Sequence, residues 1–136
     1  MTTKSNLRAI TYDVIGAAIE IHKTLGPGLL ESVYHECMKH ELQLRDIDFL
    51  SEISTPVYYK DITVATTLRC DLFVENCLVV ELKASKDIEP IAEAQLLTYM
   101  KLLEAPQGLI INFNCINIFS NGQKTFVNDF YRYLEE

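Results

Sequence analysis

Residues 71–83 constrain the fold of this chain more than any other stretch. They read Asp-Leu-Phe-Val-Glu-Asn-Cys-Leu-Val-Val-Glu-Leu-Lys, a pattern that predicts two strands joined by a tight turn. The second strand, residues 77–84, is apolar except for Glu81 and Lys83. These two side chains share one face, because successive residues of a strand point to opposite faces. A carboxylate and an ammonium group are costly to bury alone, so the strand needs a reason to keep them.

The length of the turn decides whether Asp71 meets Glu81. If Val74 pairs with Leu78 across a three-residue turn, Asp71 lies opposite Glu81 on the neighbouring strand. A two-residue turn would put them on different faces, unless a bulge corrected the register. Two adjacent carboxylates repel unless a cation lies between them, and such oxygen ligands suit Mg²⁺ or Mn²⁺. Lys83 would lie beside the cation, where it can orient a water molecule or stabilise charge on a phosphate.

Spacing alone also allows a purely structural interpretation of these residues. Glu81 and Lys83 would then form an ion pair at the edge of a sheet, with Asp71 bonded to Arg69. The pattern Glu-x-Lys is common in proteins, so by itself it does not indicate a catalytic site.

The hydrophobic pattern predicts the remaining elements and one α/β domain over residues 1–136. The expected helices cover residues 8–25, 29–45 and 90–104. The expected strands cover residues 49–53, 57–59, 62–65, 68–74, 77–84, 108–113 and 116–119. Residues 126–134 are ambiguous between a strand and a short helix. Lys60-Asp61 and Asn121-Gly122 indicate turns.

The helix expected over residues 29–45 carries a candidate acid. Its apolar residues Leu30, Val33 and Cys37 should face the core, with Tyr34 and Leu44 as further candidates. Glu31 lies in the first turn, where the helix dipole favours a carboxylate. Acids are common in first turns, so this position alone does not predict a functional role.

The helix expected over residues 90–104 carries a polar pair at positions 95 and 99. Gln95 and Tyr99 are four residues apart and therefore share a helix face. We expect Gln95 to point inward with Ile91, Tyr99 and Leu102, because charged residues of this helix fall on the opposite side. An inward glutamine needs hydrogen-bond partners. It is either a satisfied core amide or an amide beside a metal site, with the Tyr99 hydroxyl available to a phosphate.

Composition narrows the class of protein. The chain has 136 residues and is 49% hydrophobic, which suits one domain with a packed core. It has no apolar stretch that would span a bilayer and no signal-peptide core, so we expect a cytoplasmic protein with no membrane partner and with reduced cysteines. The net charge of −7 argues against a broad electrostatic footprint for nucleic acid, although an acidic metal site would offset part of it locally.

Four motifs together resemble the PD-(D/E)XK nuclease superfamily, and more closely the GxxExxY family of small bacterial proteins. In chain order they are Gly28-Leu29-Leu30-Glu31-Ser32-Val33-Tyr34, Asp71, Glu81-Leu82-Lys83 and Gln95-Leu96-Leu97-Thr98-Tyr99. The last is similar to the Gln-x-x-x-Tyr element of RecB-like nucleases. Asp71 is preceded by Cys70 rather than by proline, a departure that is frequent in the superfamily. The resemblance covers about residues 10–119.

The resemblance implies a fold and a set of roles. The fold is a mixed β-sheet flanked by helices, with a restriction-endonuclease-like core over about residues 8–120. A divalent cation, Mg²⁺ or Mn²⁺, would be held by Asp71, Glu81, the backbone carbonyl of Leu82, and Glu31. Lys83 would position the attacking water, and Gln95 and Tyr99 would line the site.

Three functions remain under consideration. The first is a Mg²⁺-dependent nuclease that hydrolyses phosphodiester bonds, with DNA expected rather than RNA. The second is a non-catalytic module on the same fold that binds nucleic acid or protein, suggested by the acidic composition and small size. The third is a hydrolase of another phosphate ester. A homodimer would add binding area, and the apolar strands of residues 108–119 could pair with a second copy at a sheet edge.

Overall fold

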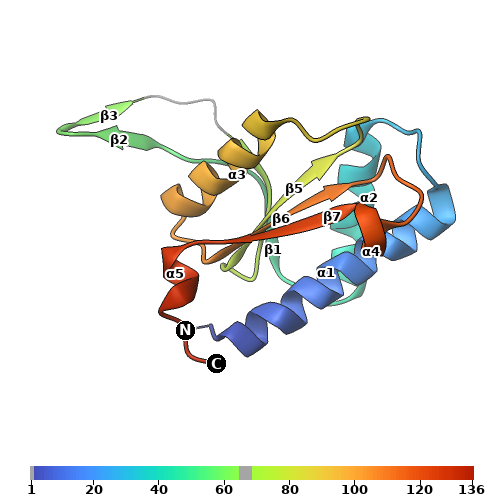
Figure 1. The fold of residues 1–136 in the computed structure, drawn as a ribbon, viewed down its shortest axis with the longest axis horizontal. Helices are drawn as coiled ribbons and strands as arrows, with labels where there is room; N and C mark the ends of the chain where they lie inside the picture. The colour runs from blue at the N-terminus through green and yellow to red at the C-terminus, as the bar shows by residue number, and fades with distance from the viewer. Residues whose placement is uncertain (1, 65–68) are drawn as a thin grey trace.

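The structure, a computed structural model, describes residues 2–64 and 69–136. Its central strands are β1 (Phe49–Ser54), β4 (Arg69–Val74), β5 (Leu78–Lys83), β6 (Gln107–Asn112) and β7 (Gln123–Val127). Within the described residues they form one five-stranded sheet in the order β1-β4-β5-β6-β7 (Figure 1). Strands β5 and β6 are parallel and the other neighbours are antiparallel, so the sheet is mixed as expected.

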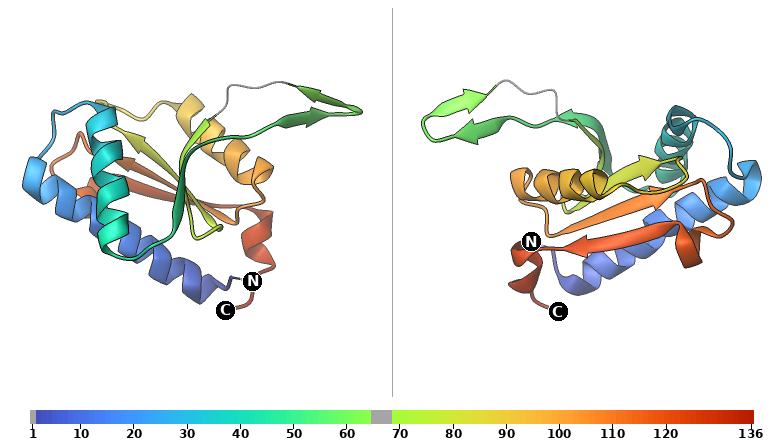
Figure 2. Two further views of the ribbon diagram at one scale, coloured as in Figure 1. Left: turned by 180° about the vertical axis from the view of Figure 1, so that it is seen from behind. Right: turned by 45° about the horizontal axis from the view of Figure 1, so that its top comes forward.

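Helices cover both faces of this sheet. Helices α1 (Lys4–Leu25) and α2 (Glu31–Leu44) pack on one face, and α3 (Pro90–Leu102) packs on the other (Figures 1 and 2). Two short helices, α4 (Ile118–Asn121) and α5 (Asp129–Arg132), flank β7. The three layers bury both faces of β5, which explains why its sequence is almost continuously apolar.

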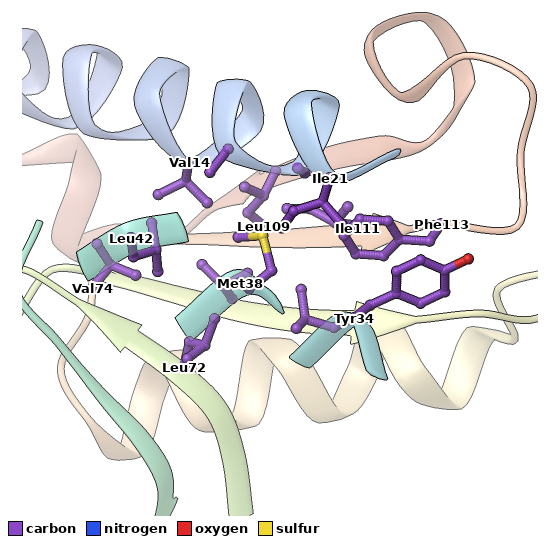
Figure 3. Close-up of a cluster of buried hydrophobic side chains, with 14 of the residues drawn as sticks. Val14, Ile21, Tyr34, Met38, Leu42, Leu72, Val74, Leu109, Ile111 and Phe113 are labelled. Carbon is purple, nitrogen blue, oxygen red and sulfur yellow. The ribbon is translucent and has the colours of Figure 1, made fainter. Parts of the chain in front are cut away.

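The larger core lies between the sheet and helices α1 and α2. Figure 3 shows Met38 and Leu42 of α2 packed among side chains from α1 and from the strands. A second cluster lies under α3, where Leu96 and Met100 pack with Val79 and Ile110. Successive residues of the central strands therefore point into different cores. A polar side chain on such a strand lies under a helix layer and is shielded from water.

The hairpin of β4 and β5 has the register that the site requires. Val74 pairs with Leu78 across a three-residue turn, so of the two turn lengths considered from the sequence the structure has the one that brings Asp71 toward Glu81. Glu75 and Asn76 have φ values of 52° and 57°, the left-handed conformation that lets this turn close. The paired register ends at Leu72 and Val80. The two strands therefore separate just before Asp71.

A second hairpin projects away from the body of the molecule. Strands β2 (Val57–Tyr59) and β3 (Ile62–Val64) pair through the expected turn, in which Lys60 has a φ of 52° (Figure 2). Tyr59 and Ile62, which pair across the hairpin, are both 59% exposed. The predictions for Ala65 and Leu68, at the ends of two expected strands, lie outside the described residues.

Near the C-terminus two sequence predictions are wrong, the strand at residues 116–119 and the free sheet edge, and one strand was not predicted. Residues 116–119 are not a strand: Asn117 accepts the Ser120 N–H at 2.9 Å and caps α4, which the pattern did not reveal. Strand β7 was not expected, and the ambiguous residues 126–134 contain both its end and helix α5. Since β6 lies between β5 and β7, residues 108–119 offer no free edge for the dimer expected there.

Helix α2 also turns a different face to the core than expected. Tyr34, Met38 and Leu42 are fully buried, whereas Leu30 is 75% exposed and Leu44 is 67% exposed. Val33 is exposed too, and Cys37 is half-buried. The helix begins at Glu31, so Leu30 is a cap residue outside it. The prediction from apolar residues alone chose Val33 and Cys37, each one position before the residues that are buried, Tyr34 and Met38.

Candidate functional site

Asp71 and Glu81 meet where β4 and β5 separate. Oδ2 of Asp71 accepts the backbone N–H of Leu82 at 2.8 Å. Oε1 of Glu81 accepts the backbone N–H of Asp71 at 3.2 Å. Each carboxylate thus satisfies a backbone donor of the other strand at the point where ladder pairing stops. The two side chains hold the opened strands together while their acidic groups lie side by side.

The environment disfavours charge on Glu81. Glu81 is 8% exposed. Its burial is the largest cause, and the negative charge of Asp71 the second, of a rise in the pKa of its carboxyl to about 8. Lys83 and the Asp71 N–H act in the opposite direction but do not compensate. A buried acid of this kind must bind either a proton or a cation near neutral pH.

The alternative ion pairs do not form. Arg69 bonds to Glu52, with 3.2 Å between Nη2 and Oε2, rather than to Asp71. Among the described residues, Glu81 and Lys83 form no salt bridge within 4.0 Å. The purely structural interpretation of the three residues is therefore wrong in both of its contacts.

A cavity of 290 Å³ lies at the end of β5, beside Lys83, and its lining does not include Asp71 or Glu81. It is lined by Glu31 at the start of α2, Lys83 at the end of β5, Gln95 on α3, and the loop that joins β5 to α3. We call it the site cavity. The pKa of the Glu31 carboxyl is raised, and burial is the largest cause. The charge of Lys83 lowers this pKa and the charge of Asp71 raises it, so Glu31 lies within electrostatic range of both residues. Three elements far apart in the sequence therefore bring polar groups to one hollow.

Gln95 and Tyr99 occupy different environments, contrary to the sequence prediction. Gln95 is exposed at the site cavity and is not a core amide, and Ile91 is 61% exposed. Tyr99 is 6% exposed in the core under α3. Burial and then the charge of Glu81 raise the pKa of its hydroxyl. The helix buries Leu96, Tyr99 and Met100, so Gln95 falls at the margin of the buried stripe.

The end of β5 is fixed by residues that sequence reasoning missed. The carbonyl of Lys83 accepts the backbone N–H of Phe113 at 2.8 Å. The side chain of Asn112 donates to the Ser85 carbonyl at 2.9 Å and accepts the Ser85 N–H at 3.2 Å. Asn112 is 9% exposed and follows three apolar residues at the end of β6, and that polar residue after an apolar run was the available signal.

A comparison with protein families identifies the superfamily to which this fold belongs. Residues 8–125 match the profile of the PD-(D/E)XK nuclease superfamily. The chain belongs to this superfamily. Its mixed sheet flanked by helices is the expected restriction-endonuclease-like fold, and nucleic acid is the substrate class that the superfamily implies. Comparisons with curated proteins and with solved structures gave no match. No described helix of this PD-(D/E)XK protein is long and apolar enough to cross a membrane.

PD-(D/E)XK nucleases typically use divalent metal ions, and the donors here are of the appropriate type. Asp71, Glu81 and the Leu82 carbonyl offer only oxygen, and a buried Glu81 beside a half-buried Asp71 favours a cation. Within residues 2–64 and 69–136, however, no three His, Cys, Asp or Glu side chains are close enough to hold a metal. Glu31 is therefore near this pair electrostatically without joining it as a third ligand in the observed rotamer.

Proposed function

We propose that this PD-(D/E)XK protein is a Mg²⁺- or Mn²⁺-dependent nuclease of the GxxExxY type that hydrolyses phosphodiester bonds. The observation that carries the proposal is the contact of Asp71 with Glu81 at the opened end of a buried hairpin, two residues before Lys83. Two carboxylates that lie close together at this point, one of them on a buried residue, offer oxygen ligands for a divalent cation.

The roles follow from the positions of the donors. Asp71, Glu81 and the carbonyl of Leu82 would hold the cation, and Glu31 would reach it through a rotamer change or a bridging water. When bound, the cation would stabilise negative charge on the phosphate and lower the pKa of a water molecule. Exposed carboxylates change rotamer at little cost, so Glu31 is suited to an outer position.

Lys83, Gln95 and Tyr99 act around the acidic pair in this proposal. Lys83 would hold the attacking water from the wall of the site cavity. Gln95, exposed at the same cavity, would bind a phosphate oxygen or the water. Tyr99 would act beneath the pair, because its hydroxyl is buried and senses the charge of Glu81.

The wider assignment rests on the composition of the chain and on its resemblance to the family, not on the geometry of the site. We propose one cytoplasmic bacterial domain over residues 1–136 whose substrate is DNA rather than RNA. With a net charge of −7, the protein gains little from long-range attraction to nucleic acid. A homodimer would supply more contact area, and its interface would involve surfaces other than β6, which is interior to the sheet.

Calorimetric titration with Mn²⁺ tests the metal site directly. We expect wild type to bind Mn²⁺ and Glu81→Ala to lose binding, because the remaining carboxylate cannot hold the ion alone. Glu20→Ala, which removes an exposed acid from α1, is the matched control and should bind as wild type does. Equal binding by wild type and Glu81→Ala would refute the assignment.

A non-catalytic binding module is the second candidate. One observation favours it: an oxygen of each acid is already occupied by a backbone N–H, as in a structural bridge. This candidate predicts that nucleic acid is bound without cleavage in Mn²⁺, with an affinity that Glu81→Ala does not change. Metal-dependent cleavage of a single- or double-stranded oligonucleotide would exclude it.

A further inference from the structure

The hydroxyl of Tyr34 closes the loop that precedes Glu31. It donates to the Gly26 carbonyl at 2.6 Å and accepts the Leu29 N–H at 3.2 Å. Tyr34 itself is fully buried, whereas the loop of residues 26–30 joins α1 to α2 and leads directly to Glu31. A buried hydroxyl that lacks partners is costly, so its two bonds to this loop account for its presence in the core.

The loop has few other anchors. Gly26 and Gly28 adopt φ values of 72° and 102°, which glycine reaches without strain but does not enforce. Leu29 is 39% exposed and Leu30 is 75% exposed, so apolar packing does not fix this segment. Among the described residues, the side-chain hydrogen bonds to the backbone of residues 26–30 come from Tyr34.

The ring of Tyr34 is connected through Phe113 to Lys83, which lines the site cavity. It stacks on Phe113, with ring centroids 4.2 Å apart and planes inclined by 5° (Figure 3). The backbone N–H of Phe113 donates to the carbonyl of Lys83 at 2.8 Å. Three consecutive contacts thus connect the loop before Glu31, through Tyr34 and Phe113, to the strand end that carries Lys83.

We propose that Tyr34 is a positioning residue that sets Glu31 relative to Lys83 and the acidic pair. The inference rests on the proposed function, because it gives Glu31 a place in the metal site. The ring alone would suffice for packing, and phenylalanine would supply it. The hydroxyl adds the loop contacts, which determine where α2 begins and therefore where its first carboxylate stands.

A double-mutant cycle with Tyr34→Phe and Glu31→Gln separates positioning from general stability. We expect Tyr34→Phe to weaken Mn²⁺ binding by about 10-fold, the lower end for groups that orient metal ligands. In the Glu31→Gln background, Tyr34→Phe should weaken Mn²⁺ binding no further, because the group that it positions is absent. The melting temperature should fall by the same amount in both backgrounds, since the loop contacts are lost in both.

Further variants make the result decisive. Leu30→Ala, a neighbouring exposed position, should bind Mn²⁺ as wild type does. Equal weakening by Tyr34→Phe in both backgrounds, or no weakening in either, would overturn the inference. If Glu81→Ala abolishes Mn²⁺ binding but Glu31→Gln does not change it, the positioning role fails and the proposed function stands. If Glu81→Ala binds as wild type does, both fail.

Discussion

The buried carboxyl of Glu81 predicts an unusual dependence of stability on pH. Its pKa is about 8 in the folded chain against an ordinary value of 4.5. A carboxyl with a raised folded pKa stabilises the fold fully below its unfolded pKa, and this contribution is lost as pH rises through the folded pKa. Each pH unit in that window changes the free energy of unfolding by about 1.4 kcal/mol, so the full effect is on the order of 5 kcal/mol.

Glu81→Gln isolates this effect. Glutamine keeps an oxygen to accept the Asp71 N–H and adds donors toward the neighbouring carboxylate, yet it does not titrate. With a chelator present, we expect wild type to lose stability between pH 5 and pH 8, in urea titrations at intervals of about one unit, while Glu81→Gln changes much less. Parallel curves for the two proteins would show that Glu81 is charged in the fold and would refute the reasoning.

The same stability measurements, repeated with Mn²⁺ in place of the chelator, test whether a cation binds at Glu81. A cation can replace the proton between the two carboxylates, so Mn²⁺ should restore the stability of wild type at pH 8 and leave Glu81→Gln nearly unchanged. The free energy of unfolding should rise with the logarithm of the ratio of the free Mn²⁺ concentration to its dissociation constant. At a ratio of one hundred the increase is about 2.7 kcal/mol. A gain of equal size in both proteins would place the binding elsewhere.

Two further predictions concern the proposed role of Lys83 and the packing of α3 on β6. Lys83→Met should abolish oligonucleotide cleavage in Mn²⁺ while circular dichroism and the urea midpoint stay close to wild type, and residual cleavage at the wild-type rate would remove Lys83 from the mechanism. Gly108→Ala should cost about 1–3 kcal/mol in urea unfolding, because the added methyl would lie 2.6 Å from Met100 Sδ and 3.0 Å from Leu96 Cγ. An unchanged urea midpoint for that variant would show that α3 can shift away freely.

Local patterns predicted the parts of the fold that depend on local rules. The apolar runs in residues 71–83 predicted the two strands, whereas the length of the turn was left open between two and three residues. The structure has the three-residue turn, whose register brings Asp71 to Glu81. The separation of the strands at Asp71 was not predictable, because it depends on side chains that bond to the backbone of the opposite strand. Those bonds exist only after the hairpin has formed.

Predictions about helix faces failed because tertiary packing chooses among apolar stripes. Helix α2 had apolar residues on two sides, and the sheet selected the side with Tyr34. Gln95 fell at a boundary where a rotation of one residue changes a core position into a cavity wall. Tyr34 was noted as a core candidate and as the last residue of the motif at residues 28–34. The use of its hydroxyl was not predictable, because it depends on the conformation that the loop of residues 26–30 adopts in the fold.

The parallel pairing of β5 with β6 has a consequence for the order in which contacts can close. The acidic pair belongs to a hairpin of neighbouring strands, so its contacts are local in sequence. The hydrogen bond from Phe113 to Lys83 can form only after β6 has paired with β5, and α3 lies in the crossover that joins these two strands. Closing this longer loop costs more conformational entropy than closing the hairpin, so it is expected later in folding. Asp71 and Glu81 can therefore meet while water still solvates their charges. Glu81 becomes a buried acid only when α3 closes over the hairpin.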